Sequence, residues 1–187
     1  KLSIELPLAL VLAVLLNAKM VGRDVYRVLF FLPTVISVAI IGVVFSFIFA
    51  SYDGVVNNIL INFKLISRSI SWFSSKWLAL SILAIASIWQ NFGINMIFFL
   101  TGLQSIPASL YECAEIDGAS KTSQFFHITI PMLAPVLQVV VMLATLGSLK
   151  ITGLVLVLTG GRPAGKTEVM MTYVYKKFFG NSIMGAA

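Results

Sequence analysis

The chain alternates between long apolar stretches and shorter polar segments. The apolar stretches cover residues 2–16, 28–50, 77–103 and 132–159. A helix needs about 20 apolar residues to cross the hydrocarbon core of a membrane, so the last three stretches are long enough. The first has about 15 residues and is short for a span. The pattern predicts an all-α integral membrane protein, a polytopic helical bundle with a single transmembrane domain over residues 1–187.

Composition supports this class and excludes others. Hydrophobic residues make up 59% of the chain and charged residues 11%, against roughly 25% charged residues in soluble domains. The net charge of +6 does not indicate nucleic-acid binding, because the basic residues are scattered over the loops instead of lining one face. One Cys and one His exclude an internal disulfide and leave no ligand set for a metal. We expect no nucleic-acid partner, no metal and no catalytic residue.

Two polar segments contain amphipathic patterns that are typical of helices lying at a membrane surface. In the first, apolar residues fall on one helical face, opposite Asn57, Asn58 and Asn62. That apolar face consists of Val56, Ile59, Leu60 and Phe63. The second covers residues 169–179, with Lys176 and Lys177 on its polar side. Residues 180–187 then resemble the approach to another span.

The longest polar interruption, residues 111–131, separates the third and fourth apolar stretches. Ser109 and Glu112 have the spacing of a capping box, which predicts a helix start after Pro107. Gly118 predicts that this short helix ends in a left-handed turn. A second amphipathic run follows and reaches Pro131. A short rigid helix between two spans suits docking to another protein better than catalysis.

The residues of this interruption resemble the EAA loop of ABC importer permeases, and more narrowly the permeases of maltose and multiple-sugar importers. The matching segments are Glu112-Cys113-Ala114, Ile116-Asp117-Gly118-Ala119 and Ile128-Thr129-Ile130-Pro131. Cys113 stands where the family usually has Ala, which is a small change. The resemblance continues through Phe30-Phe31-Leu32-Pro33, Trp89 and residues 103–107, so it covers nearly the whole chain.

The resemblance implies the fold of the type I ABC importer transmembrane domain, with residues 104–131 as a cytoplasmic coupling loop. It also implies that residues 2–16 are part of a longer span, so we expect the domain to be truncated at both ends. The implied coupling residues are Glu112, Ala114, Asp117, Gly118, Ala119 and Pro131. The implied partners are two cytoplasmic ABC ATPase subunits, a second homologous permease subunit, an extracytoplasmic sugar-binding protein and membrane lipid. The chain itself would bind no cofactor, because ATP is used by the partner subunits, and it would lie in the bacterial cytoplasmic membrane.

Polar residues within the spans are candidates for the substrate path, because amides and hydroxyls both donate and accept hydrogen bonds with sugar hydroxyls. Asn91 and Asn95 share a helical face at i, i+4. Residues of the fourth stretch form a second stripe, in which Lys150 is the only charge deep in the span. The candidates are Asn91, Asn95, Thr145, Ser148, Lys150 and Thr152. Hydrogen bonding between helices is the alternative, and it is the favoured explanation for any single one of these residues. The family often has Phe-Asp where this chain has Thr152-Gly153, which leaves the substrate contacts open.

Residues 160–167 match the phosphate-binding pattern G-x-x-x-x-G-K-[ST],. The apolar stretch before them is too long for a strand, and no apolar run ends in an acidic residue that would hold magnesium. Leu158-Thr159-Gly160-Gly161 and Pro163 resemble a turn of sugar permeases. We interpret the nucleotide match as a coincidence.

The charges of the loops disagree with the coupling motif. Four basic residues lie in the two loops on the coupling side and seven in the two loops opposite. The positive-inside rule would therefore place the coupling loop outside. We give priority to the motif because it is more specific. The alternatives are an ABC importer permease for another solute, such as an amino acid or phosphate, and a secondary carrier or membrane scaffold without an ATPase.

Overall fold

The computed structural model describes residues 1–18 and 20–180, and its regular elements there are all helices. The chain forms two compact units. Unit 1 consists of residues 1–35 and 91–146, and unit 2 consists of residues 36–90 and 147–187. Each unit has its own hydrophobic core.

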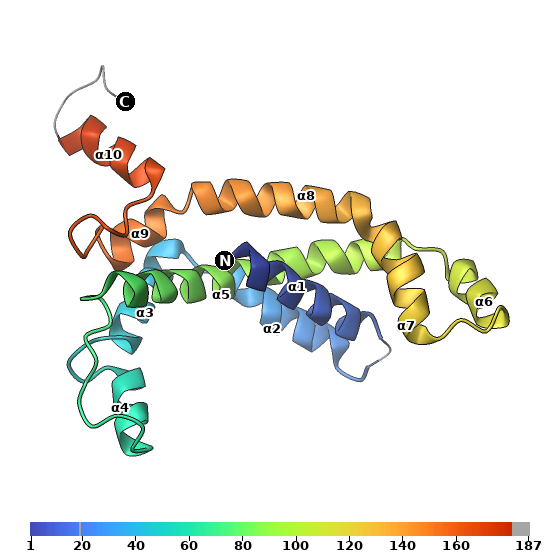
Figure 1. Ribbon diagram of the computed structural model, residues 1–187, viewed down its shortest axis with the longest axis horizontal. Helices are drawn as coiled ribbons and strands as arrows, with labels where there is room; N and C mark the ends of the chain where they lie inside the picture. Colours follow the sequence, from blue (N-terminus) through green and yellow to red (C-terminus); the bar gives the residue numbers. More distant parts are fainter. Residues whose placement is uncertain (19, 181–187) are drawn as a thin grey trace. The chain divides into compact units, whose positions relative to one another are not determined.

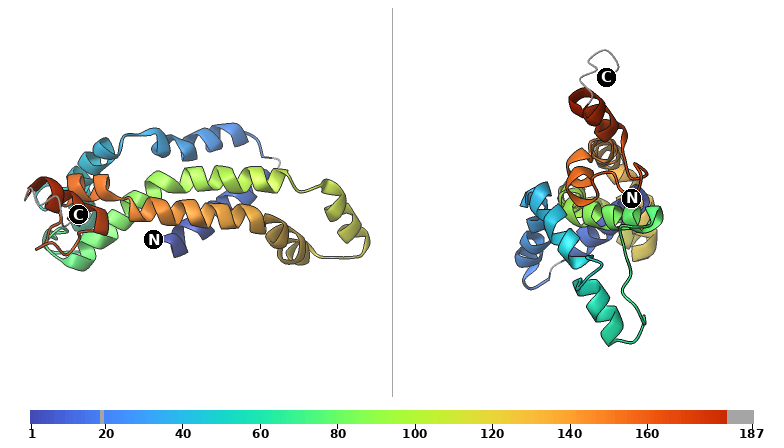
Figure 2. Two further views of the ribbon diagram at one scale, coloured as in Figure 1. Left: turned by 90° about the horizontal axis from the view of Figure 1, so that it is seen from above. Right: turned by 90° about the vertical axis from the view of Figure 1, so that its left-hand side faces the viewer.

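Unit 1 contains the pair of helices that flank the predicted coupling loop. Its elements are α1 (Leu2–Asn17), α2 (Arg23–Val35), the second half of α5 (Lys76–Gln104), α6 (Ala108–Ile116), α7 (Lys121–Gln124), the π-helical turn η1 (Phe125–Thr129) and most of α8 (Ile130–Leu149). The second half of α5 and α8 lie side by side (Figures 1 and 2). They pack closely at Gly102, where an added Cβ would lie 2.9 Å from side-chain atoms of Leu133 and Val136.

The core of unit 1 forms where small residues of α1 meet large residues of α5. Ala9 and Ala13 are fully buried, and they belong to one cluster with Met96 and Phe99. On another side, Gly93 of α5 touches the backbone of α2, because a Cβ there would overlap the carbonyl group of Phe30. Small residues at such crossings let apolar helices approach closely in a membrane.

Unit 2 consists of shorter helices around the first half of α5. They are α3 (Val38–Ile48), α4 (Val55–Asn62), α9 (Thr152–Leu158) and α10 (Met170–Gly180). Its core joins Ile41 and Phe45 of α3 to Ile82 of α5 and Val155 of α9. Gly42 brings α3 and α9 together, since a Cβ there would lie 2.6 Å from a methyl group of Val157.

A helix, α4, forms where the first surface helix is predicted, but one asparagine is oriented differently. Ile59 and Phe63 are exposed, as expected for a face toward lipid. Asn57, predicted on the polar face, is instead fully buried. It is buried because its side chain bonds to backbone groups of the following loop. The second predicted surface helix corresponds to α10, but the side chains of Lys176 and Lys177 are outside the described part of the chain. Residues 181–187, which belong to the predicted approach to another span, are outside it as well.

Two helices of the described chain are long and apolar enough to cross a membrane, residues 76–104 and 121–149, each 29 residues long. The predicted stretch 77–103 thus agrees closely with α5. The predicted stretch 28–50 is instead divided into α2 and α3, which meet at 95°. Counted as one bent span, the pair raises the total to three. Helix α1 is apolar but shorter.

The breaks occur where helical hydrogen bonding is weak. Pro33 lies near the end of α2 and lacks the N–H that a continuous helix would use,. Ile36 lies between α2 and α3, and its carbonyl accepts a hydrogen bond from Nε2 of Gln90 at 3.3 Å. This side chain takes the place of the backbone N–H that would bond to the carbonyl in a continuous helix. The predicted stretch 132–159 also divides, because α8 ends at Leu149 and α9 begins at Thr152. Lys150 is therefore at an exposed break and not deep in a continuous helix.

Candidate functional site

The predicted coupling helix is present as α6, and it is solvent-exposed. None of its nine residues is buried. Figure 1 shows it at one end of unit 1, past the ends of the α5–α8 pair, and Figure 2 agrees. Glu112 and Asp117 are exposed, and the side chain of Ile116 is 86% exposed. The sequence pattern did not single out Ile116, because only its exposure distinguishes it.

The start of α6 differs from the prediction. The helix begins at Ala108 with Pro107 as its N-cap, and no side chain caps it. The predicted capping box of Ser109 and Glu112 is therefore wrong, because Ser109 already lies inside the helix. Proline holds its own φ near the helical value and disfavours a helical residue before it. It thus separates α5 from α6 without a capping side chain.

The end of α6 agrees with the prediction at Gly118. This residue has φ +78°, which glycine adopts without the steric cost of a Cβ. The Ala119 N–H donates to the Ala114 carbonyl at 2.8 Å, and the Gly118 N–H donates to the Glu115 carbonyl at 3.1 Å. This pair of bonds is the Schellman motif, which closes a helix C-terminus and fixes the direction of the chain. Ala114 and Ala119 are half-buried here, on the inner side of the turn.

Helix α6 is tied to the next element by side chains. The Tyr111 hydroxyl lies 2.9 Å from Oγ1 of Thr129, a buried residue of η1. Lys121 Nζ is 3.6 Å from Glu115 Oε1, but this exposed ion pair is worth little,. Tyr111, Lys121, Gln124 and Thr129 also border a cavity of about 460 Å³ next to α6. The partly buried Tyr111–Thr129 bond thus connects α6 to η1.

Pro131 lies at the start of α8, directly after the π-helical turn. Proline has no N–H to donate to the carbonyl four residues earlier. The preceding turn is wider than an α-turn, and the Ile130 N–H bonds to the Phe125 carbonyl, five residues back. Through this bulge α7, η1 and α8 continue as one helix from Lys121 to Leu149. A movement of α6 therefore has a continuous helical connection into the apolar part of unit 1.

The single cysteine and the single histidine have the roles expected of non-catalytic residues. Cys113 is exposed on α6. His127 is exposed, and its Nδ1 lies 3.0 Å from the Ser123 carbonyl of the preceding turn. Among the described residues, no group of three His, Cys, Asp or Glu side chains is placed to hold a metal.

Among the predicted path residues of unit 1, Asn95 is engaged within the core. It is 4% exposed, and its amide donates to Glu5 Oε1 at 2.8 Å. Glu5 is fully buried and also pairs with Lys1 Nζ at 3.4 Å. Asn91 is half-buried, and Thr145 is exposed and donates to the Val141 carbonyl of its own helix at 2.7 Å. The carboxylate of Glu5 was not among the sequence candidates.

The other three predicted path residues lie in unit 2, around the break between α8 and α9. Ser148 and Thr152 are half-buried, and Lys150 is exposed. Thr152 Oγ1 is buried, and no group in the described part of the chain bonds to it. A buried hydroxyl without a partner is costly, and this oxygen has almost no exposed surface that a group from outside the chain could reach in this structure.

The glycine-rich segment of residues 160–167 is a closed turn without a phosphate cradle. Thr167 is 1% exposed, and its hydroxyl donates to the Arg162 carbonyl at 2.7 Å. The Thr159 hydroxyl accepts from the Gly161 N–H at 3.2 Å and lies 2.9 Å from the Thr167 hydroxyl. In a nucleotide site the Thr167 hydroxyl would bind magnesium, but here it is hydrogen-bonded within the turn. This geometry supports the interpretation of the nucleotide-binding pattern as a coincidence.

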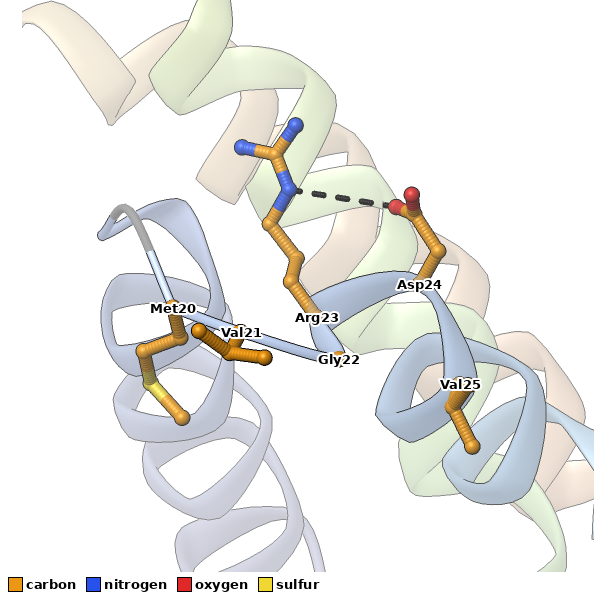
Figure 3. A pocket seen from close by; sticks show the side chains of 6 residues that line it. All are labelled: Met20, Val21, Gly22, Arg23, Asp24 and Val25. Carbon is orange, nitrogen blue, oxygen red and sulfur yellow. Dashed lines mark ion pairs between the residues drawn. The ribbon is translucent and has the colours of Figure 1, made fainter.

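The connection between α1 and α2 borders a depression of about 710 Å³, which residues 20–25 line (Figure 3). Gly22 turns the chain with φ +79°. Arg23 Nε lies 3.8 Å from Asp24 Oδ1, and Arg27 donates to the same oxygen at 3.1 Å. Both arginines thus share the single carboxylate of Asp24, and we assign the depression no ligand.

Comparison with known proteins gives consistent matches over most of the chain. The family described as "Binding-protein-dependent transport system inner membrane component" matches residues 5–184. The chain is 37% identical over 182 residues to LacF, the lactose transport system permease protein of Rhizobium radiobacter, with 96% of this chain and 61% of LacF covered. It is 35% identical over 180 residues to YurN, described as a probable ABC transporter permease protein of Bacillus subtilis, with 95% of this chain and 62% of YurN covered.

A third relative is AraP, the arabinooligosaccharides transport system permease protein of Halalkalibacterium halodurans. It is 33% identical over 175 residues, with 92% of this chain and 55% of AraP covered. The chain thus spans less than two thirds of the length of these relatives.

Solved structures show the same fold. A bacterial ABC transporter involved in the import of the acidic polysaccharide alginate matches with a TM-score of 0.84 and 24% identity, over 95% of this chain and 62% of that chain. A bacterial alginate ABC transporter in complex with an alginate pentasaccharide-bound periplasmic protein matches with a TM-score of 0.78 over the same shares. The predicted fold class, that of an ABC importer transmembrane domain, is confirmed.

Proposed function

Because this chain belongs to the family of binding-protein-dependent transport system inner membrane components, we propose that it forms part of the translocation path of an ATP-driven sugar importer. It is an integral membrane protein, and we place it in the bacterial cytoplasmic membrane. The names of its relatives support a sugar or oligosaccharide as the solute, since LacF serves lactose and AraP serves arabinooligosaccharides. The chain would not hydrolyse ATP, and two cytoplasmic ATPase subunits would do so.

The observation that carries this proposal is the exposure of α6. A short helix with no buried residue sits between two helices long enough to cross a membrane. An isolated helix of nine residues is marginal in water, so the Schellman turn and the Tyr111–Thr129 bond are needed to hold it. Such an arrangement is suited to receive force from a partner and to pass it to α8.

We assign roles to the coupling residues from their positions on α6. Ile116 is the apolar anchor that enters a groove of the ATPase subunit, and Glu112 and Asp117 supply polar contacts around it. Gly118, Ala114 and Ala119 form the turn that fixes the angle of the helix. Pro131 marks the junction at which α8 begins. Closure of the ATPase dimer would push α6, and the continuous helix from Lys121 to Leu149 would carry the movement into the membrane.

The substrate path would be lined by this chain and by a second homologous permease subunit. Asn91, Thr145, Ser148, Lys150 and Thr152 remain candidates for this lining. The Asn95 amide is bonded to Glu5 within the core of unit 1. An extracytoplasmic sugar-binding protein would deliver the solute.

The test uses substitutions of Gly118 in the intact importer. No atom lies within 4 Å of a Cβ added there, so only backbone strain distinguishes the variants. Gly118→Val should lose sugar uptake about tenfold or more while ATPase activity continues, because a β-branched residue resists a positive φ. Gly118→Asn is the matched control, since asparagine tolerates that region, and it should keep most of the uptake.

Uptake and ATPase activity are measured together in proteoliposomes. Normal uptake by Gly118→Val would contradict the coupling role of the turn. Ile116→Ser gives a second readout, because loss of the exposed anchor should release the ATPase subunits during purification. Retention of the ATPase subunits by that variant would remove Ile116 from the proposed contact.

A further inference from the structure

The hydrogen bonds at the two ends of α6 are distributed unequally. On the side of α5, the last bond runs from the Ile106 N–H to the Leu103 carbonyl at 3.4 Å, and Pro107 has no N–H to donate. The first bond of α6 runs from the Leu110 N–H to the Pro107 carbonyl at 3.2 Å. In the part of the chain that the structure describes, no backbone hydrogen bond therefore crosses the junction between Ile106 and Pro107.

On the other side, hydrogen bonds lead from α6 into α7 without a gap. The Ala119 N–H donates to the Ala114 carbonyl of α6 at 2.8 Å. The Ala119 carbonyl in turn accepts from Nε2 of Gln124 at 3.2 Å. Gln124 is 4% exposed, and a hydrogen bond shielded from water is stronger than an exposed one. Ser120 then caps α7, because its hydroxyl accepts from the Ser123 N–H at 3.2 Å.

A second buried side chain closes these bonds into a ring. Thr129 of η1 is 6% exposed, and its hydroxyl lies 2.9 Å from the hydroxyl of Tyr111 in α6. The same hydroxyl donates to the Gln124 carbonyl at 3.5 Å, which is a long hydrogen bond,. Gln124 thus contacts the turn with its side chain and Thr129 with its backbone. Helix α6 is therefore joined to the following elements both at its end and at its middle.

The junction between α5 and α6 has the character of a hinge. Hinges are a few residues at the ends of elements that absorb changes in φ and ψ. Residues 105–107 are not helical, and Ile106 is anchored in the core of unit 1. The ring of Tyr111 packs against the same core, but an apolar contact is non-directional and permits a small displacement. Movement of α6 relative to α5 thus breaks no hydrogen bond at this junction.

We propose that α6, α7 and η1 move as one rigid unit that pivots between Ile106 and Pro107, with Gln124 and Thr129 as the positioning residues that hold it together. Neither belongs to the coupling residues that the family resemblance implies. This inference rests on the proposed function, and it specifies the route of the movement. The rigid unit passes its displacement to α8, which continues from η1 as one helix, and not to α5.

The first experiment measures sugar uptake and ATP hydrolysis together in proteoliposomes of the complete importer with its sugar-loaded binding protein. Thr129→Val and Gln124→Met remove polar groups with little change of size, and each should lower the sugar transported per ATP about fivefold or more. Thr129→Ser should retain the ratio, since it keeps the hydroxyl. Thr101→Val is the matched control, because that hydroxyl donates to the Phe98 carbonyl of its own helix at 2.8 Å, and its ratio should be unchanged.

The second experiment tests the pivot by inserting one glycine on either side of α6. An insertion between Ile106 and Pro107 interrupts none of the backbone hydrogen bonds of the described residues, so the ratio should stay within about twofold. An insertion between Ala119 and Ser120 displaces the Ala119 carbonyl from the Gln124 amide and should lower the ratio about fivefold or more. Both insertions lengthen the loop by the same residue, so they differ in the bonds that they interrupt.

Several outcomes would overturn the proposal. Equal ratios in Thr129→Val and Thr101→Val would remove the role of the hydroxyl, and equal losses from the two insertions would remove the pivot. A fall of uptake and ATP hydrolysis by the same factor would assign Gln124 and Thr129 to the stability of the fold alone.

Tyr111→Phe removes the other hydroxyl of the bond and provides a second variant if Thr129→Val does not insert into the membrane. The double variant Tyr111→Phe/Thr129→Val should be no worse than either single variant, and additive losses would contradict action through their shared bond. Failure of the proposed function is distinguishable, because the unmodified importer would then show no sugar-dependent ATPase stimulation.

Discussion

At the residue scale, the least expected feature is a carboxylate buried among apolar helices. Glu5 is fully buried in unit 1 and is held by Lys1 at 3.4 Å and by Asn95 at 2.8 Å. A buried charge is expensive unless it is paired and hydrogen-bonded. The pair Glu5–Asn95 therefore fixes α1 against α5 at one defined register, in addition to the apolar contacts of Ala9 and Ala13.

This residue pair leads to a prediction about stability. Asn95→Leu should destabilise the protein by about 1–3 kcal/mol, because Glu5 loses the amide that donates to it. Glu5→Gln should cost less, since its carbonyl can still accept from Asn95 while the buried charge is removed. Thermal unfolding in detergent measures both effects. The single variant Glu5→Leu and the double variant Glu5→Leu/Asn95→Leu complete a cycle with Asn95→Leu, and purely additive effects would contradict a direct interaction.

Single residues of the coupling loop were predictable where the reason was local. Gly118 was predicted from its position after a short helix, and its φ of +78° agrees. Ser109 was predicted as an N-cap from spacing alone, but Pro107 takes that place. The Glu5–Asn95 pair was not predictable, because 90 positions separate the partners. Local chemistry is readable in one sequence, whereas a contact between distant helices is set by their packing.

At the scale of elements, close helix contacts depend on glycine. An added Cβ at Gly93 would overlap the Phe30 carbonyl and lie 2.9 Å from its carbon atom. Because both atoms belong to the backbone of α2, no rotation of a side chain relieves the overlap. Gly147 in α8 is the contrasting case, since no atom lies within 4 Å of a Cβ there.

These two glycines allow a matched comparison. Gly93→Ala should lower stability by about 1–3 kcal/mol, because α2 must move away from α5. Gly147→Ala should leave stability unchanged or raise it by up to about 1 kcal/mol, because alanine has the higher helix propensity. Thermal unfolding in detergent, with the yield of membrane-inserted protein as a control, distinguishes the two. Equal effects of both substitutions would show that the α2–α5 contact does not constrain the fold.

Helix existence was more predictable than helix continuity. The apolar stretch 77–103 corresponds to α5 almost residue for residue. The stretches 28–50 and 132–159 are equally apolar, yet each contains a break. Hydropathy reports whether a segment tolerates lipid, and it carries little information about a bend. The bend after Val35 relies on the amide of Gln90, a partner that lies 54 positions away in the chain.

At the scale of the whole molecule, the distribution of charge and the coupling motif disagree about orientation. Unit 2 carries the whole excess of positive charge, and the positive-inside rule would place its polar loops in the cytoplasm. The rule reflects the cost of translocating short basic loops, and it weakens as loops lengthen. A loop clamped by Asn57 and bearing exposed aromatic residues has a folded structure of its own. The charge of the loops alone is therefore not sufficient to decide the orientation of this chain in the membrane.

The single thiol of the chain makes orientation measurable. Cys113 is exposed on α6, so a membrane-impermeant maleimide should modify it in inside-out vesicles and leave it unmodified in intact cells. The matched control is Cys113→Ser/Ser67→Cys, which moves the thiol to an exposed residue of the loop after α4 and should reverse the result. Labelling of Cys113 from outside the cell would place α6 away from any cytoplasmic ATPase. The coupling role of residues 104–131 would then fall, while membership in the family would stand, because it rests on residues 5–184 as a whole.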